Sequence, residues 1–247
     1  MVKLSVIIPH LNYGRYLKEC LDSLDLQTFR DFEVILVDGG SNDSTFEVLK
    51  DYSWVKVLSD VPPQGPVKAV NKGILAMKGG FFHQLNSDCV LEPTMFEDCM
   101  AVHERYPNLG FVYTGWRIIN DDGETVGFAK QPKQFNRNLL LRGNFVDASS
   151  MIIQRECFTR LGDFDERCPW SMDWLMAAKT SEFYPVRFID RPLFRYRVHK
   201  GQITETKSQK EAGKASKIIR GYYSWDERLK SDLTVFARKI GKELLRR

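Results

Sequence analysis

Between residues 32 and 41 the chain reads Phe32-Glu33-Val34-Ile35-Leu36-Val37-Asp38-Gly39-Gly40-Ser41. The apolar part, from Phe32 to Val37, favours a strand that is buried on both faces, because four consecutive apolar residues leave neither face polar. The polar end predicts a turn, and a helix is expected to follow it, capped by Ser41 or Asn42. This order of strand, polar turn and helix is the repeating unit of α/β folds.

The same alternation continues over the first 115 residues. Further strands are expected at residues 4–8, 54–58, 81–85 and 109–113, and further helices at residues 15–26, 67–77 and 95–105. Strands of this kind predict a mostly parallel sheet that helices cover on both sides. In such a sheet the ligand site lies beyond the carboxyl ends of the strands. Three polar clusters are expected there, namely Pro9-His10-Leu11-Asn12, Asp38-Gly39-Gly40 and Asn86-Ser87-Asp88.

The pattern changes in the second half of the chain. Strands are expected at residues 116–120, 125–128, 150–153, 186–189 and 193–198, and a helix at 172–181, which together predict an α+β arrangement. From residue 207 the sequence predicts a helix, with an apolar stripe from Leu229 to Leu244. We therefore expect one domain over residues 1–206, with halves at 1–115 and 116–206, followed by a basic helical extension over residues 207–247.

Composition narrows the class of protein. The chain has 247 residues, of which 43% are hydrophobic and 28% charged, values that exclude a disordered or collagen-like chain. Its five cysteines are odd in number and form no Cys-x-x-Cys pair, which argues against a disulfide framework or a zinc site and favours a reducing, cytoplasmic location. Residues 207–247 carry 12 basic and 5 acidic side chains, a net +7 that leaves −3 for the remainder.

Common nucleotide-binding motifs are missing from the sequence. It has no Gly-x-x-x-x-Gly-Lys-Ser/Thr phosphate loop and no Gly-x-Gly-x-x-Gly after the first strand. This argues against ATP-driven and NAD-linked chemistry.

Several short motifs occur together in a fixed order. They are Ser5-Val6-Ile7-Ile8-Pro9 with Asn12, Val37-Asp38-Gly39-Gly40-Ser41-Asn42-Asp43-Ser44, Gly65 with Ala69-Val70-Asn71-Lys72-Gly73, Leu85-Asn86-Ser87-Asp88-Cys89, Met172-Asp173-Trp174 and Arg197-Val198-His199. Over residues 3–205 this series resembles a family-2 glycosyltransferase of the GT-A type. Two positions depart from the family pattern, because Gly39 and Cys89 stand where the family often has carboxylates. The resemblance implies a Rossmann-like α/β fold and transfer of a sugar from a nucleotide-diphosphate sugar.

The resemblance assigns the nucleotide to the first half of the chain. A uracil ring offers one N–H donor and two carbonyl acceptors. Asp38 is expected to accept from the N–H, and the backbone of Pro9, His10, Leu11 and Asn12 to serve the carbonyls. The alternative is that Asp38 only caps the following helix. Gly65, Lys68 and Asn71 are expected beneath the nucleotide sugar.

A departing diphosphate needs positive charge, and the resemblance implies Mn²⁺ or Mg²⁺. Carboxylate oxygen is a natural ligand for such a cation, and Asp88 is the expected one. Asn86 and Ser87 are expected to hold the ribose or a metal-bound water. His199 is expected to contact the metal or a phosphate, with a surface-loop histidine as the alternative.

The acceptor hydroxyl needs a base, and Asp173 is expected to fill that role. Trp170 and Trp174 flank it, and apolar neighbours would raise the pKa of its carboxyl group. The alternative is that Asp173 only charges the start of a helix. Trp170 and Trp174 are expected to contact the acceptor sugar, and Asp147 is a further candidate for a sugar contact.

The resemblance implies an inverting glycosyltransferase that uses a UDP-sugar and a saccharide or lipid-linked saccharide acceptor. No nucleic acid partner is expected. The basic extension is expected either to pack on the body or to lie on an anionic membrane at the inner face. Two other functions stay open. One is a non-catalytic sugar or nucleotide binder. The other is a sugar-phosphate nucleotidyltransferase, which would need a Gly-rich, Arg-containing loop after the first strand, where this chain has His10-Leu11-Asn12-Tyr13-Gly14.

Overall fold

The computed structural model describes residues 2–202 and 217–219. Their strands are β1 (Leu4–His10), β2 (Phe32–Asp38), β3 (Val55–Ser59), β4 (Phe81–Gln84), β5 (Val90–Leu91), β6 (Phe111–Ile119), β7 (Thr125–Phe128), β8 (Met151–Gln154) and β9 (Val186–Arg197). Their helices are α1 (Gly14–Asp25), α2 (Thr45–Leu49), α3 (Pro66–Ala76), α4 (Met95–Arg105), α5 (Arg137–Leu140), α6 (Arg155–Leu161) and α7 (Met172–Phe183), with a 3₁₀ turn, η1 (Ala148–Ser150).

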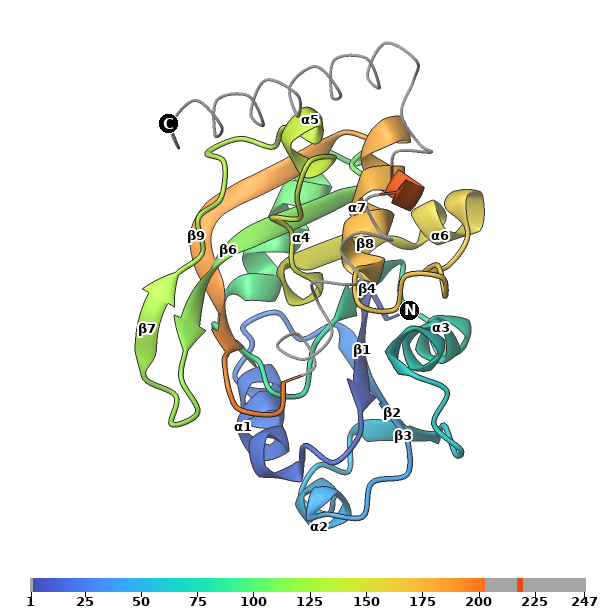
Figure 1. The fold of residues 1–247 in the computed structure, drawn as a ribbon, viewed down its shortest axis with the longest axis vertical. Helices are drawn as coiled ribbons and strands as arrows, with labels where there is room; N and C mark the ends of the chain where they lie inside the picture. Colours follow the sequence, from blue (N-terminus) through green and yellow to red (C-terminus); the bar gives the residue numbers. More distant parts are fainter. Residues whose placement is uncertain (1, 203–216, 220–247) are drawn as a thin grey trace, which may run out of the picture.

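Within this described part, nine strands form one sheet (Figure 1). The order is β3-β2-β1-β4-β8-β6-β9-β5, and β7 pairs with β6. Strands β1 to β4 run parallel to one another, as expected, whereas β8 is antiparallel to both β4 and β6. The carboxyl ends of β3, β2, β1 and β4 therefore follow one another along one edge of the sheet.

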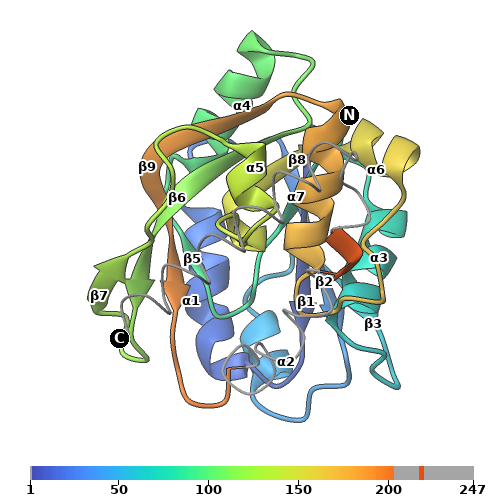
Figure 2. The ribbon, with the colours of Figure 1, turned by 45° about the horizontal axis from the view of Figure 1, so that its top comes forward.

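Helices cover both faces of the sheet. Helices α3, α6 and α7 pack on one face, and α1 and α4 pack on the other (Figure 2). Strand β1 contributes to both cores, because Ile7 lies in the cluster with α3 and its neighbours Val6 and Ile8 lie in the cluster with α1. Gly73 lets α3 approach β1 closely, since a Cβ atom there would lie 2.3 Å from Cγ2 of Ile7.

Most expected elements are present, and three differ from expectation. The strands expected at 109–113 and 116–120 form the single strand β6, and those expected at 186–189 and 193–198 form β9. The β6–β9 register shifts around Gly115, so these strands continue through an irregularity where the sequence indicated an end. Helix α2 begins at Thr45, and its backbone N–H donates to Asp43 rather than to Ser41 or Asn42.

The described residues leave two expectations untested. The apolar stripe from Leu229 to Leu244 lies outside them, and the domain boundaries stay a prediction, although the proposed boundary at residue 115 falls within β6. No helix among the described residues is long and apolar enough to cross a membrane.

Candidate functional site

A cleft of about 560 Å³ lies at the carboxyl edge of the sheet. The loops after β1 to β4 form one side, and the segments before η1 and α7 form the other. Ten of the residues expected in a site line this cleft, namely Pro9, His10, Leu11, Gly65, Asn86, Ser87, Asp88, Asp147, Trp170 and Asp173. The structure therefore brings the three polar clusters together with residues from the second half of the chain.

The charged side chains that line the cleft are all acidic. Asp60, Asp88, Asp147 and Asp173 line it, and no lysine or arginine is among its lining residues in the described part of the chain. An anionic ligand such as a diphosphate would meet electrostatic repulsion in this setting. A cation that binds together with the ligand would remove the repulsion.

Asp38 does not line the cleft, and it does not cap α2 either, because its hydrogen bonds go to the loop that precedes this helix. Its Oδ2 accepts hydrogen bonds from the backbone N–H groups of Gly40, at 2.9 Å, and Ser41, at 3.1 Å. Its Oδ1 accepts from the Ser41 hydroxyl at 2.6 Å. Asn12 also serves the loops, because its Oδ1 accepts from the backbone N–H of Asn42 at 2.9 Å. Both side chains therefore stabilise the loop between β2 and α2, next to the cleft.

Asp60 was not expected and does line the cleft. It follows β3 directly and is only 4% exposed, with Oδ1 3.5 Å from Nζ of Lys72. Its backbone N–H donates to the carbonyl of Asp38 at 2.7 Å. The rule that polar residues at strand ends form the site, applied to β3 as it was to β1, β2 and β4, would have identified Asp60.

Lys68 and Asn71 do not line the cleft. Lys68 donates to Oε1 of Gln64 at 3.0 Å and lies 3.8 Å from Glu166. The Asn71 amide pairs with the backbone of Phe164, donating to its carbonyl at 2.9 Å and accepting from its N–H at 3.1 Å. Asn71 thereby fixes the segment between α6 and α7 to α3, and this segment carries Trp170 into the cleft.

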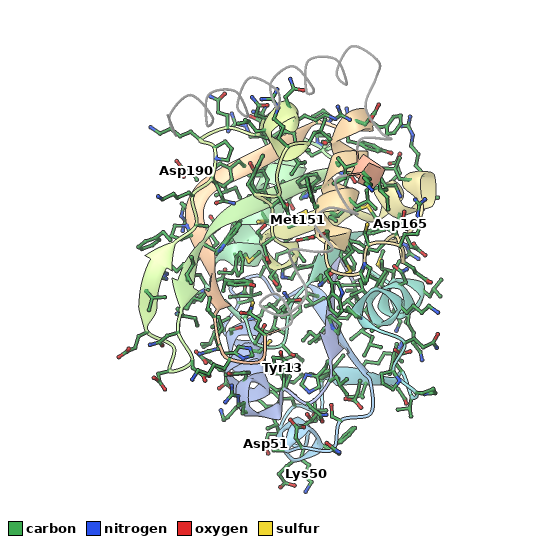
Figure 3. The ribbon with its side chains drawn as sticks, in the orientation of Figure 1. Tyr13, Lys50, Asp51, Met151, Asp165 and Asp190 are labelled. Carbon is green, nitrogen blue, oxygen red and sulfur yellow. The ribbon has the colours of Figure 1, made fainter. Side chains whose placement is uncertain are left out.

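Asp88 and His199 face each other. Nε2 of His199 lies 3.3 Å from Oδ2 of Asp88, and this hydrogen bond raises the pKa of the imidazole. The rings of Tyr13 and Tyr16 pack against the imidazole at centroid distances of 5.4 Å and 4.8 Å. Tyr13, labelled in Figure 3, lies at the start of α1 and donates to the carbonyl of Gly201 at 3.5 Å. The loop after β9 is thus held beside Asp88.

The pair of Asp88 and His199 fits a divalent cation. Two ligands at right angles on a cation with bonds of about 2.1 Å lie about 3 Å apart, close to the observed separation. Carboxylate oxygen and imidazole nitrogen are both suitable ligands for Mn²⁺. Among the described residues no group of three or more His, Cys, Asp or Glu side chains could hold a metal. The other ligands would therefore have to come from a bound diphosphate and water.

Arg197 stabilises the backbone of Asp88, a role that the sequence did not predict. It is 2% exposed, and its Nε donates to the backbone carbonyl of Asp88 at 3.1 Å. Its Nη1 donates to the carbonyl of Asp121 at 2.9 Å, and its Nη2 pairs with Glu19. One guanidinium thus connects α1, the loop that carries Asp88 and the β6–β7 hairpin. The sequence marked Arg197 only as part of a motif, because its burial is a property of the fold.

Asp173 and Asp147 lie on the opposite side of the cleft. Asp173 occupies the first turn of α7 and accepts from the backbone N–H of Trp174 at 2.7 Å and from Nδ2 of Asn144 at 3.1 Å. Burial raises the pKa of Asp173 to about 6. Burial, together with the charge of Asp173, raises the pKa of Asp147 to about 7. Both groups can therefore exchange a proton near neutral pH.

Of the two tryptophans expected to contact the acceptor, one lines the cleft and the other lies in the core. Trp170 lines the cleft. The expectation for Trp174 needs correction, because its indole is 6% exposed, belongs to the hydrophobic core and donates to the carbonyl of Leu140 at 2.6 Å. Met172 and Asp173 line the cleft, and the next residue of the helix, Trp174, turns about 100° further round it and into the core.

Comparisons with known proteins point to one family. Residues 5–161 match the model of glycosyl transferase family 2. The chain is 28% identical over 209 residues to an uncharacterized glycosyltransferase of Rickettsia typhi, covering 82% of this chain and 66% of that protein. It is 30% identical over 199 residues to a chondroitin synthase of Pasteurella multocida, covering 79% of this chain and 20% of the synthase. The chain therefore spans less than two thirds of the length of either relative.

Solved structures share the fold. S. aureus TarS 1-349 in complex with UDP-GlcNAc aligns with a TM-score of 0.74 at 19% identity, over 93% of this chain and 69% of that one. The mannosyltransferase PcManGT from Pyrobaculum calidifontis, in complex with GDP-Man and Mn²⁺, aligns with a TM-score of 0.67 at 19% identity, over 93% and 68%. At this identity the likeness concerns the fold alone, and the expected GT-A architecture is confirmed.

Proposed function

The chain belongs to glycosyl transferase family 2, and from this premise we propose that it transfers a sugar from a UDP-sugar to a hydroxyl acceptor, with inversion at the anomeric carbon. The observation that carries the proposal is the composition of the cleft. A carboxylate with a pKa near neutrality, Asp173, lies on one side. On the other side lies Asp88, and His199, which is not itself among the lining residues, pairs with it in an arrangement suited to a divalent cation. These are the two chemical groups that direct displacement of a nucleotide diphosphate requires.

Each side of the cleft has a separate task. Asp173 accepts the proton of the acceptor hydroxyl, and its pKa of about 6 leaves it ionised at neutral pH. Trp170 offers an indole surface for the acceptor sugar beside it. Asp88 and His199 would hold Mn²⁺ or Mg²⁺, which would supply positive charge to neutralise the charge that develops on the leaving diphosphate.

The nucleotide is proposed to lie along the ends of β3, β2 and β1. Asp60, the loop of Pro9, His10 and Leu11, and Gly39 line this end of the cleft. Asn86 and Ser87, which line the cleft, are proposed to contact the ribose or a metal-bound water. The choice of UDP draws support from TarS, which was solved with UDP-GlcNAc. A saccharide acceptor draws support from the chondroitin and hyaluronan synthases of Pasteurella multocida among the relatives.

Location and acceptor type stay proposals. The cytoplasm, and contact of residues 207–247 with the inner face of the membrane, rest on composition alone. A lipid-linked acceptor would be consistent with such contact.

Calorimetry with UDP, with and without Mn²⁺, tests the proposed function. The expected result is UDP binding that tightens when Mn²⁺ is added, because the cation offsets the carboxylates of the cleft. Absence of UDP binding under both conditions would contradict the proposed donor. Binding without any donor hydrolysis or transfer would favour a non-catalytic binder.

A further inference from the structure

Gln84 carries a polar atom that the protein leaves without a partner. The side chain is 3% exposed, lines the cleft and lies at the end of β4. Its Nε2 donates to Oδ1 of Asn86 at 3.1 Å. Its Oε1 is buried and has no hydrogen-bond partner among the described residues. An unpaired buried acceptor of this kind lowers the stability of the folded protein.

A second buried glutamine shows what a structural role looks like in this protein. Gln27 is fully buried, and its amide makes three hydrogen bonds. Nε2 donates to the carbonyls of Ser23, at 3.1 Å, and Glu92, at 2.8 Å, and Oε1 accepts from the backbone N–H of Phe96 at 3.1 Å. Gln27 does not line the cleft. Gln84, by contrast, lines the cleft with an acceptor that no described residue pairs, which points to a ligand as the missing partner.

The sheet order places Gln84 between the nucleotide end and the proposed base. Along the edge, Asp60 follows β3, His10 ends β1 and Gln84 ends the next strand, β4. The strand beyond is β8, which directly follows η1 and its preceding residue, Asp147 (Figure 1). Asn86 is tied to this far side, because its backbone N–H donates to the Ser149 hydroxyl at 3.2 Å.

We propose that Gln84 is a specificity-determining residue whose amide oxygen accepts a hydrogen bond from a hydroxyl or amide N–H of the transferred sugar. The inference rests on the proposed function, since in a donor stretched from Asp60 to Asp173 the sugar is the part that lies over β4. The bond from Gln84 to Asn86 also fixes the Gln84 amide, so that Oε1 is the atom left to accept a hydrogen bond. A sugar that lacks the matching group would leave Oε1 buried and unpaired, which disfavours it.

The test compares Gln84→Met with Gln27→Met and the wild-type protein. Methionine keeps the length of the side chain and removes its hydrogen-bonding groups. Binding of UDP and of UDP-glucose, UDP-galactose, UDP-GlcNAc, UDP-GalNAc and UDP-glucuronate is measured by calorimetry with Mn²⁺, and thermal melting reports on folding. The variable that decides is the ratio of the affinity for the best UDP-sugar to the affinity for UDP.

For Gln84→Met we expect this ratio to fall about tenfold while UDP affinity changes less than twofold. The preference among the five UDP-sugars should narrow as well. Gln27→Met should lower the melting temperature and leave the ratio unchanged. An unchanged ratio in Gln84→Met, or an equal loss for UDP and UDP-sugar, overturns the inference alone. If the wild-type protein binds neither UDP nor any of the five UDP-sugars, the proposed donor class fails first.

Discussion

Replacing Asp173 with asparagine should have opposite effects on activity and on stability. Asparagine keeps the shape of the side chain and an oxygen that can accept from the Trp174 N–H, but it cannot take a proton from a hydroxyl. Loss of a general base typically costs about 10²–10⁴-fold in rate. UDP affinity should change little, because Asp173 lies across the cleft from the strand ends proposed to hold the nucleotide.

The stability gain follows from the pKa of the carboxyl group. Its pKa of about 6 in the folded protein stands against an ordinary value of 3.8. Two units correspond to about 3 kcal/mol by which ionisation disfavours the folded state. This penalty is fully present above pH 6 and is lost as the pH falls below 3.8. Since the side chain keeps some contact with water, we expect Asp173→Asn to be about 1–3 kcal/mol more stable at pH 8 and no more stable near pH 3.5.

The assay pairs transfer or donor-hydrolysis rates with thermal unfolding at several pH values. Each kcal/mol should move the melting temperature by about 2–4 °C in a domain of this size. Asp165→Asn is the matched control. Asp165 pairs with Arg167, does not line the cleft and is labelled in Figure 3 on the segment between α6 and α7. Substantial transfer by folded Asp173→Asn would refute the assignment of the base, and a loss of stability at pH 8 would refute the account of its burial.

Three further predictions concern Asp88, Arg197 and the basic extension over residues 207–247. Asp88→Ala should lower Mn²⁺ affinity by about 100-fold or more, measured as the Mn²⁺ dependence of UDP binding, and wild-type binding that ignores Mn²⁺ would contradict its role as a ligand. Arg197→Lys should raise the Mn²⁺ concentration needed for half-maximal rate by about tenfold, because one ammonium group cannot replace the guanidinium group that binds the Asp88 carbonyl. The control Arg191→Lys, which changes an exposed ion pair with Asp98, should leave this Mn²⁺ concentration unchanged. Co-sedimentation with anionic vesicles at low salt compares the full chain with a chain ending at Thr206. Loss of vesicle binding on truncation would support membrane contact of residues 207–247, whereas no binding by the full chain, or unfolding of the truncated chain, would show that they pack on the body.

The fold was largely predictable from the sequence. The strand expected at 32–37 spans Phe32–Asp38, and the helix expected at 95–105 spans Met95–Arg105, because apolar runs and helical periodicity report burial directly. The continuity of β9 was not predictable, because Asp190 and Pro192 are turn-type residues that here lie within a strand whose register shifts. Tertiary pairing with β6 outweighed this local signal.

The site was predictable as a place and only partly as a set of contacts. Strand-end position indicated which loops meet, and the structure brings His10, Asp88, Asp147 and Asp173 into one cleft. It did not indicate the direction of each side chain. Asp38 lies at the end of β2, as expected, but its carboxylate accepts hydrogen bonds from the N–H groups of Gly40 and Ser41. Roles that depend on burial, such as those of Gln84 and Arg197, become visible only when their partners are known.

The central claim is most directly tested by the products formed from a UDP-sugar. Wild-type protein, Asp173→Asn and Asp165→Asn are incubated with Mn²⁺ and each of the five UDP-sugars, with and without saccharide acceptors, and the products are followed by NMR. The account predicts release of UDP by the wild-type protein and Asp165→Asn, at a rate about 10²–10⁴-fold lower for Asp173→Asn, and a transferred sugar of inverted anomeric configuration. Release of sugar 1-phosphate, retention of configuration, or no reaction with any UDP-sugar would contradict it.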